Sequence, residues 1–361
     1  MNRQDEVIDS AIDMGLADES ETRGGGGERR AGLQGVMGIW SRIPDSLRGT
    51  VPVIVAIIAL GTYTASQTPL FLTQTNLRNI LQQSSVLGLI AVGMTALMIA
   101  GLMDLSVGTM ASFISVVGAL MAKHGSSAFV IVVAAVLIGL GASSVWGLIV
   151  GYVKVHPFIL TLGGMSIFLS LGLALSKGQP VPVEGMFVSL DIGKWLGVPV
   201  SSVLFLVAAV VMALFLKFTR VGRNTFAMGS NPQAAFLAGV PQIRLPVYLF
   251  AISGVLVGLA AIVMIGRLGA GDPTAGSSLG LQAIAAVVIG GSSLYGGTGT
   301  VFGTMLGVLL LGLIQNSLNI LGIQIFYQDL VYGSVLIVAI VSTSLREQGR
   351  LRLPRLRHRA K

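Results

Sequence analysis

The amino-acid sequence predicts an all-α integral membrane protein. Of its 361 residues, 53% are hydrophobic and 11% are charged, and the mean hydropathy is +0.84. Soluble domains average about 25% charged residues, so this composition is not that of a soluble protein. Its apolar residues fall into runs close to the roughly 20 residues that a helix needs to cross a bilayer. We therefore expect about ten transmembrane helices.

The expected spans follow one another with short polar or glycine-rich connections, and several of them are short or broken. They centre on residues 51–66, 81–101, 106–122, 129–150, 157–176, 201–217, 246–266, 281–294, 300–320 and 328–345. Together they define a transmembrane domain over residues 49–345.

Both ends of the chain are polar. Residues 1–48 hold nine of the fifteen acidic residues and a run of four glycines at 24–27, without the basic, apolar and small-residue pattern of a signal peptide. We interpret this segment as a disordered cytoplasmic tail. Residues 346–361 are expected to form a basic cytoplasmic tail.

The distribution of Lys and Arg predicts the orientation. With the N-terminus inside, eighteen basic residues lie on the inner side and five on the outer side. Positive residues concentrate on the cytoplasmic side of membrane proteins. Ten spans then bring both termini to the cytoplasm, and they also place the polar segment 221–243 there.

The segment 221–243 contains the signals of one short helix. Asn231 followed by Pro232 is a helix start, because Asn caps free amides and Pro fits the first turn. Gly239 is a helix stop. Residues 233–238 leave room for one or two turns, which are unstable alone in water. We therefore expect a helix that docks on another molecule.

Two segments share a pattern that suggests interrupted helix pairs. Residues 94–113 and 284–303 each run from an apolar stretch through glycine and a short turn to Gly-Thr. Interrupted helices of this kind line the substrate path in many transporters. Close helix packing is the alternative explanation for glycines in membranes. The candidate gate or hinge glycines are Gly101, Gly108, Gly290, Gly291, Gly296 and Gly297.

Asp104 stands between two apolar spans, and a carboxylate at such a place requires an explanation. It either caps the third span or lines and gates a passage, for which the nearby Ser106 is also a candidate. Both interpretations remain open from the sequence.

The ninth span carries Gln315, Asn316 and Asn319 on neighbouring positions of one helix face. Unpaired amides are costly in hydrocarbon, so these side chains either make contacts between helices or line a polar passage. Thr161 in the fifth span is a further candidate for the passage. A hydroxyl in a helix also bonds readily to its own backbone.

Several kinds of chemistry are excluded. The chain has no cysteine, its three histidines are dispersed, and no G-x-x-x-x-G-K-[ST] loop for nucleotide phosphates is present. We expect no catalytic site, no metal and no cofactor. The basic residues lie at segment ends rather than beside aromatics, so we expect no nucleic acid. If the chain moves a solute, the energy comes from another subunit or from a gradient.

Four stretches resemble the permease subunits of bacterial ABC importers for ribose, xylose and related monosaccharides, in the branched-chain amino acid/ribose permease family. The resemblance extends over roughly residues 75–345. The stretches are GLMDLSVGTM at 101–110, HPFILTLGGMSIF at 156–168, GRNTFAMGSNPQAAFLAGV at 222–240 and LQAIAAVVIGGSSLYGGTGTVFGTMLGVLLLG at 281–312.

The resemblance implies a multi-pass subunit of the bacterial plasma (inner) membrane, surrounded by lipid and paired with a second permease, either an identical copy in a homodimer or a relative. It also implies a cytoplasmic ATPase subunit that binds ATP, and a periplasmic or lipid-anchored sugar-binding protein. In such importers the polar loop holds the helix that contacts the ATPase. The residues expected in this coupling loop are Arg223, Gly229, Asn231, Ala235, Phe236 and Gly239.

The sequence departs from the family pattern at two places. Leu102 and Met103 precede Asp104 where relatives usually have Gly-Ile, and Phe236 stands where they often have Arg. The first departure bears on the identity of the sugar, and the second places an aromatic side chain toward the ATPase. An ion-coupled secondary transporter is the alternative, but it needs a titratable cluster within the spans, and Asp104 is a single carboxylate.

Overall fold

The computed structural model describes residues 50–341, except for residues 184, 188–192, 196, 325–326, 329, 332, 336 and 339–340. The tails expected at 1–48 and 346–361 lie outside the described residues, as does part of the last span, expected at 328–345.

The described residues form an assembly of helices with two very short strand pairs. In chain order the elements are α4 (Val51–Gln67), α5 (Gln74–Ile99), α6 (Val107–Lys123), α7 (Ala128–Val153), α8 (Pro157–Ser176), β1 (Val181–Pro182), β2 (Lys194–Trp195), β3 (Val198–Pro199), α10 (Val200–Phe218), α11 (Arg220–Ser230), α12 (Pro232–Leu237), α13 (Arg244–Leu268), β4 (Ala270–Gly271), α14 (Leu279–Ile289) and α15 (Val301–Ile320). Strand β1 pairs antiparallel with β4, and β2 with β3.

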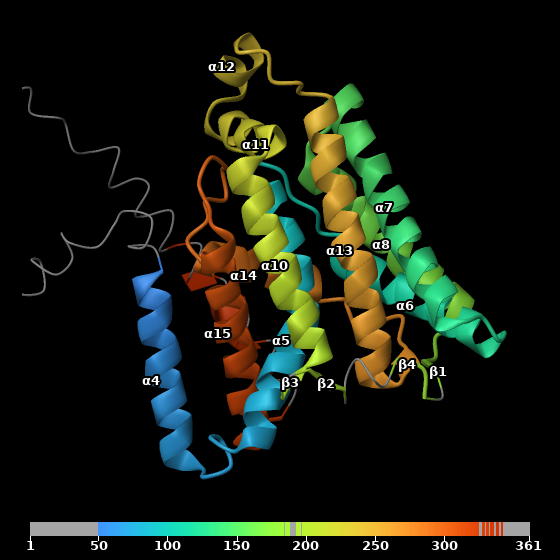
Figure 1. Ribbon diagram of the computed structural model, residues 1–361, viewed down its shortest axis with the longest axis vertical. Coiled ribbons are helices and arrows are strands. Elements are labelled where there is room, and N and C mark those ends of the chain that lie inside the picture. The colour runs from blue at the N-terminus through green and yellow to red at the C-terminus, as the bar shows by residue number, and fades with distance from the viewer. Residues whose placement is uncertain are drawn as a thin grey trace, which may run out of the picture. The chain divides into compact units, whose positions relative to one another are not determined.

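The helices run between two opposite ends of the molecule. Figure 1 shows α11 and α12 at the upper end, and the strands β1, β2, β3 and β4 at the lower end. Among the described helices, α5, α7, α8, α10, α13 and α15 are long and apolar enough to cross a membrane, whereas α4, α6 and α14 are apolar but shorter. The structure is therefore that of an all-α integral membrane protein.

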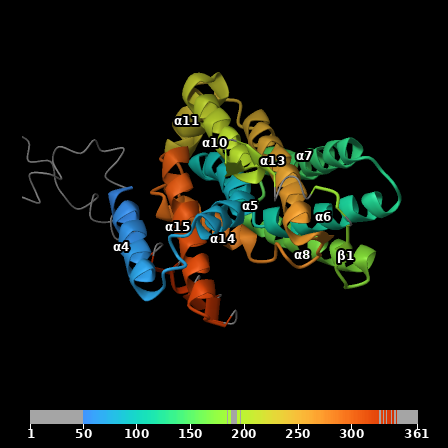
Figure 2. The same cartoon turned by 60° about the horizontal axis from the view of Figure 1, so that its bottom comes forward.

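Helix α5 lies at the centre. Figure 2 shows α10, α13, α14 and α15 around it, and each of these helices contacts it. In its most apolar window 83% of the residues are buried within the protein, against 22% for α7 and for α8. The side chains of α7 that face away from the protein are apolar, and those of α8 are apolar apart from Ser166 and Ser170.

Glycine permits a close contact between α7 and α13. A Cβ atom on Gly139 would overlap the carbonyl of Gly254, and one on Gly258 would lie 2.5 Å from the Ala135 carbonyl oxygen. Small residues allow the backbones of membrane helices to approach in this way. The pair α7 and α13 thus forms a closely packed side of the bundle.

Most expected spans agree with the helices to within a few residues, and residues 157–176 agree at both ends. Helix α5 begins seven residues earlier than expected, at Gln74, because the Thr73 hydroxyl accepts a hydrogen bond from the Asn76 amide and caps the polar first turns. Helix α14 ends at Ile289 rather than near 294, since Gly290 and Gly291 follow and Gly291 has φ +92°.

Helix α11 differs from the expectation, which places a polar loop with one short helix here. It begins after Thr219, whose hydroxyl accepts a hydrogen bond from the Gly222 amide at 3.0 Å. Its buried residues, Gly222, Thr225 and Met228, recur every three residues and face the bundle. The segment 221–243 therefore holds most of one amphipathic helix and a second, short one.

Candidate translocation and coupling site

Two breaks in the transmembrane helices meet beside α11. The first is residues 100–106, between α5 and α6, and the second is residues 290–300, between α14 and α15. The Gly297 amide donates a hydrogen bond to the carbonyl oxygen of Ile99 at 2.8 Å. A Cβ atom on Gly296 would lie 2.9 Å from the Gly101 amide nitrogen, so the two backbones touch there as well.

The candidate hinge glycines divide into two groups. Gly101, Gly296 and Gly297 lie where the breaks meet, with φ values of +77°, +93° and +77° that favour glycine. Gly108 instead contacts the backbone of Gly276, and Gly290 contacts that of Gly303. Gly291, with its positive φ, ends α14 through a hydrogen bond from its amide to the Val288 carbonyl.

Helix α11 contacts the meeting point of the breaks directly. A Cβ atom on Gly229 would overlap the Ile99 carbonyl oxygen and would lie 2.5 Å from the Gly297 amide nitrogen. The next residue, Ser230, packs against Gly297, whose Cβ atom would lie 2.8 Å from the Ser230 Oγ atom. The polar loop is thus in backbone contact with both interrupted helices.

Helix α12 projects from this contact at the upper end of Figure 1. The Asn231 side chain accepts a hydrogen bond from the Ala234 amide at 3.0 Å, and Pro232 is the first helical residue. Ala235 is buried, whereas the side chains of Phe236 and Leu237 are 65% and 85% exposed. Their exposure gives α12 an apolar tip.

Backbone and side-chain hydrogen bonds at both ends of the α11–α12 segment stabilise the position of α12. Gly239 has φ +81°, and its amide donates to the Phe236 carbonyl at 3.0 Å, which ends α12 as a glycine C-cap does. The Val240 amide donates to the Ala235 carbonyl at 3.0 Å. Arg223 lies in α11, where its guanidinium donates to the Phe218 carbonyl at 3.4 Å.

Asp104, Ser106 and Thr161 come together at the start of α6. The buried Asp104 carboxylate accepts hydrogen bonds from the amide and the hydroxyl of Ser106, at 2.8 and 2.6 Å, through its Oδ1 atom. The Leu105 amide donates to the Thr161 hydroxyl at 3.1 Å. The N-cap position of α6 is Ser106, so Asp104 binds the capping residue rather than the free amides of the helix.

The three amides of α15 lie in different surroundings. Asn316 and Asn76 exchange reciprocal hydrogen bonds of 2.9 and 2.7 Å and are both buried, which joins α15 to α5. Asn319 accepts a hydrogen bond from Gln328 at 2.7 Å. Gln315 lines a cavity. Two of the three therefore make contacts between segments, and one faces open space.

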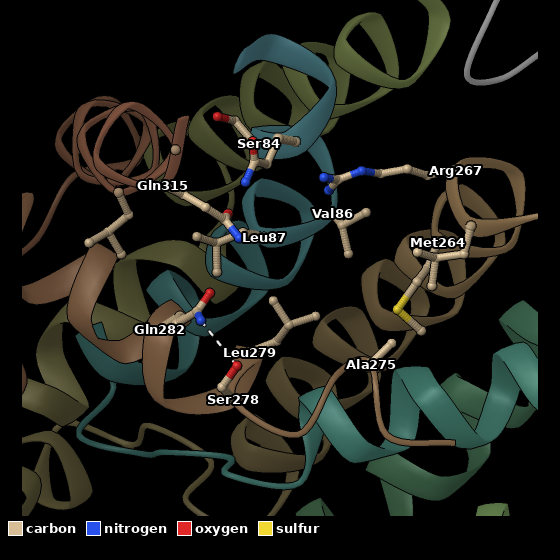
Figure 3. A pocket seen from close by; sticks show the side chains of 14 residues that line it. Ser84, Val86, Leu87, Met264, Arg267, Ala275, Ser278, Leu279, Gln282 and Gln315 are labelled. Atoms are coloured by element: carbon tan, nitrogen blue, oxygen red, sulfur yellow. Dashed lines mark hydrogen bonds between the residues drawn. The ribbon is translucent and has the colours of Figure 1, made fainter. Parts of the chain in front are cut away.

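That cavity has a volume of about 190 Å³ and lies between α5, α13, α14 and α15, as Figure 3 shows. Its polar lining is mostly uncharged. The lining residues are Gln83, Ser84, Val86, Leu87, Met264, Arg267, Leu268, Ala275, Ser278, Leu279, Gln282, Leu311, Gly312 and Gln315. Apart from Gln315, sequence reasoning missed this set. The run Gln82 to Ser85, four polar residues inside an apolar span, was the available signal.

Among the described residues, no group of three or more His, Cys, Asp or Glu side chains is placed to hold a metal ion. The site instead offers two helix breaks in contact, an exposed helix attached to them and a polar cavity. A helical membrane bundle with such breaks is typical of a membrane transport subunit.

The comparison with known proteins is specific. Residues 76–340 match the family described as branched-chain amino acid transport system / permease component, and the chain belongs to this family. It is a permease subunit and not an enzyme, and a multi-pass protein of the bacterial inner membrane. No solved structure matches the chain.

Curated relatives agree with this membership. The chain is 38% identical to ribose import permease protein RbsC of Bacillus subtilis over 276 residues, which cover 76% of this chain and 86% of the relative. It is 36% identical to D-allose transport system permease protein AlsC of Escherichia coli over 295 residues, covering 81% and 90%. It is 32% identical to L-arabinose ABC transporter permease protein AraH of Azospirillum brasilense over 314 residues, covering 87% and 91%. These relatives do not favour the ion-coupled alternative.

Proposed function

We propose that this chain is the transmembrane subunit of an ATP-binding-cassette importer for a ribose- or xylose-like monosaccharide or a related polyol. In this proposal ATP is bound and hydrolysed by a separate cytoplasmic ATPase subunit, and this chain holds no cofactor. An extracytoplasmic binding protein delivers the sugar. The names of the relatives, which concern ribose, allose and arabinose, support a sugar as cargo.

The observation that carries the proposal is the contact of the α11–α12 segment with both helix breaks. Gly229 lies against Ile99 and Gly297, while Phe236 and Leu237 project outward from the same segment. A helix of six residues is too short to be stable by itself, so its exposed apolar tip favours a docked partner. The chain lacks a nucleotide-binding P-loop, which is consistent with an ATPase as that partner.

The mechanism follows from these contacts. When the ATPase subunits close on ATP, they move α12 through Phe236 and Leu237, and Asn231 and Gly239 keep the ends of α12 fixed. Ala235 is buried, and Arg223 anchors the start of α11 through its hydrogen bond to the Phe218 carbonyl. The movement reaches the breaks at Gly229, where the glycine backbone of residues 101, 296 and 297 can change conformation without steric cost. Interrupted helices then shift and open the passage to the other side.

The proposal includes ten spans with both termini in the cytoplasm, and α12 on the cytoplasmic side. The charge distribution supports this orientation. Two copies of the permease surround the passage, with the exposed apolar faces of α7 and α8 in lipid. Asp104, Ser106 and Thr161 brace the start of α6 within each copy, next to the first break.

The experiment is uptake into proteoliposomes that contain this chain with its ATPase and binding protein. We expect accumulation of labelled D-ribose, L-arabinose or D-allose with ATP on the ATPase side, and none with a non-hydrolysable ATP analogue. Accumulation in vesicles without the ATPase, driven by a proton or sodium gradient, would contradict the proposal.

A further inference from the structure

We infer that the cavity between α5, α13, α14 and α15 is a binding site for one neutral, hydroxyl-rich solute molecule, held by the side-chain amides of Gln83, Gln282 and Gln315. The inference rests on the proposed function, because it gives the cargo a place of contact within a single permease chain.

The polar lining matches hydroxyl groups. A primary amide both donates and accepts hydrogen bonds, as a sugar hydroxyl does, so each amide can bind a hydroxyl in either sense. Gln282 is held across the cavity edge by a hydrogen bond from its Nε2 atom to the Ser278 hydroxyl at 3.1 Å, drawn as a dashed line in Figure 3. The side-chain carbonyl oxygen of Gln282 does not take part in this hydrogen bond. Gln315 approaches from α15, on a different helix.

The apolar lining matches the carbon skeleton of a sugar. Leu87, Leu279 and Met264 project into the cavity in Figure 3 and come from three different helices. Small-molecule sites combine such apolar walls with a few polar groups that fix orientation. A monosaccharide ring presents C–H groups on its faces and hydroxyls at its edge, and both find counterparts here.

The charge of the lining selects against an amino acid. Among the lining residues that the structure describes, Arg267 is charged and none is Asp or Glu. An amino acid zwitterion would need a partner for its ammonium group, because an unpaired buried charge is costly. A neutral solute has no such need.

The size of the cavity limits the solute to a small one. Its volume of about 190 Å³ lies below the roughly 300–1,000 Å³ of sites that take drug-sized ligands. The cavity thus suits one sugar ring rather than an oligosaccharide.

The cavity lies toward the end of the bundle opposite α12. It is lined by the last residues of α13 and the first of α14, and α13 runs from the α12 end to the end that holds β4 (Figure 1). Toward the breaks, α5 and α15 are joined by a hydrogen bond of 2.7 Å between the Thr95 and Thr304 hydroxyls. In the proposed orientation the cavity is therefore on the side where a binding protein releases its sugar.

The test uses the absence of cysteine from this chain. Gln315→Cys creates a single thiol in the cavity, and Gln179→Cys creates a control thiol on the exposed residue after α8, at the same end. In proteoliposomes with the ATPase and binding protein, each variant is treated from outside with a charged, membrane-impermeant methanethiosulfonate. Labelling of the permease is measured with and without D-ribose, L-arabinose or D-allose, and with L-leucine.

We expect an imported sugar at ten times its half-saturating concentration to slow labelling at residue 315 by about tenfold, and labelling at residue 179 to be unaffected. L-Leucine is expected to have no effect. Protection by L-leucine instead of a sugar, or equal labelling with and without sugar, would overturn the inference.

A second measurement distinguishes this inference from the proposed function. Gln282→Met and Gln315→Met each remove an amide at similar volume, and we expect sugar uptake to fall about tenfold for each, since a lost hydrogen bond of about 1.4 kcal/mol corresponds to that factor. Gln179→Met is the matched control and keeps wild-type uptake. Wild-type uptake in both cavity variants would overturn the inference alone. ATP-dependent uptake of no sugar by the wild-type complex would overturn the proposed function as well.

Discussion

The backbone of Gly229 in α11 lies directly against the carbonyl group of Ile99, the last residue of α5. The same carbonyl oxygen accepts a hydrogen bond from the Gly297 amide, in the second helix break. Three segments far apart in the sequence therefore share one contact point. It connects the α11–α12 segment with both interrupted helix pairs.

Gly229→Ala tests this contact. The added Cβ atom would overlap backbone atoms of Ile99, which cannot move aside as a flexible side chain can. We expect a loss of about 1–3 kcal/mol in stability, typical of overpacking, measured as a lower unfolding temperature in detergent. Gly141→Ala in α7 is the control, because its Cβ atom would meet no atom within 4 Å. Equal unfolding temperatures for the two variants would argue against the contact.

Asp104→Asn and Asp104→Ala separate hydrogen bonding from charge at the first break. The Oδ1 atom of Asp104 accepts both bonds from Ser106, whereas among the described residues its Oδ2 atom has no hydrogen-bond partner. Asn retains an acceptor, so we expect it to keep the fold, while Ala should cost about 1–3 kcal/mol in stability. Thermal unfolding measures this difference. If Asn lowers stability as much as Ala, the charge itself is required.

Thr161→Val removes the acceptor of the Leu105 amide and leaves that buried N–H unpaired. The expected cost is about 1–3 kcal/mol in stability, the penalty for an unsatisfied buried donor. Thr161→Ser keeps the hydroxyl and is expected to unfold near the wild-type temperature. A Val variant as stable as the Ser variant would show that the bond does not brace α6.

The Asn76–Asn316 pair distinguishes helix packing from a role in the passage. Asn76→Leu or Asn316→Leu leaves the other buried amide without its partner across the helix pair. Each single variant is therefore expected to lose about 1–3 kcal/mol in stability. The double variant should recover much of that loss, giving a coupling energy of about 0.5–3 kcal/mol in a double-mutant cycle. Uptake is measured alongside. A stable double variant that no longer imports sugar would assign these amides to the passage.

Much of the fold can be predicted from the sequence because lipid requires long, apolar, internally hydrogen-bonded helices. Residues 157–176 illustrate this, since Pro157 starts the run and Ser176 ends it. Helix α11 could not be predicted in the same way, because its residues are polar. The sequence signal of α11 is the Thr219 cap followed by an apolar or small residue at every third position. In a segment of eleven residues this signal is weak.

The site could be predicted only in part, for a physical reason. The start of α12 depends on adjacent residues, Asn231 and Pro232, so it is visible locally. The partner of Asn316 is 240 residues away, and the contact of Gly229 with Ile99 depends on how three segments pack. The cavity likewise draws its lining from four helices. No local pattern contains these relationships.

The central claim is that α12 is the surface on which the ATPase docks, and co-purification of the two subunits tests it most directly. The variants are Phe236→Ser and Leu237→Ser, which remove exposed apolar side chains, with Tyr152→Ser, an exposed aromatic at the end of α7, as control. Interface hot spots cost about 2 kcal/mol or more. We predict that Phe236→Ser and Leu237→Ser together weaken binding by about thirtyfold or more, while Tyr152→Ser binds normally. If the Phe236→Ser/Leu237→Ser double variant co-purifies with the ATPase as the wild type does and keeps full ATP-driven uptake, the account is contradicted.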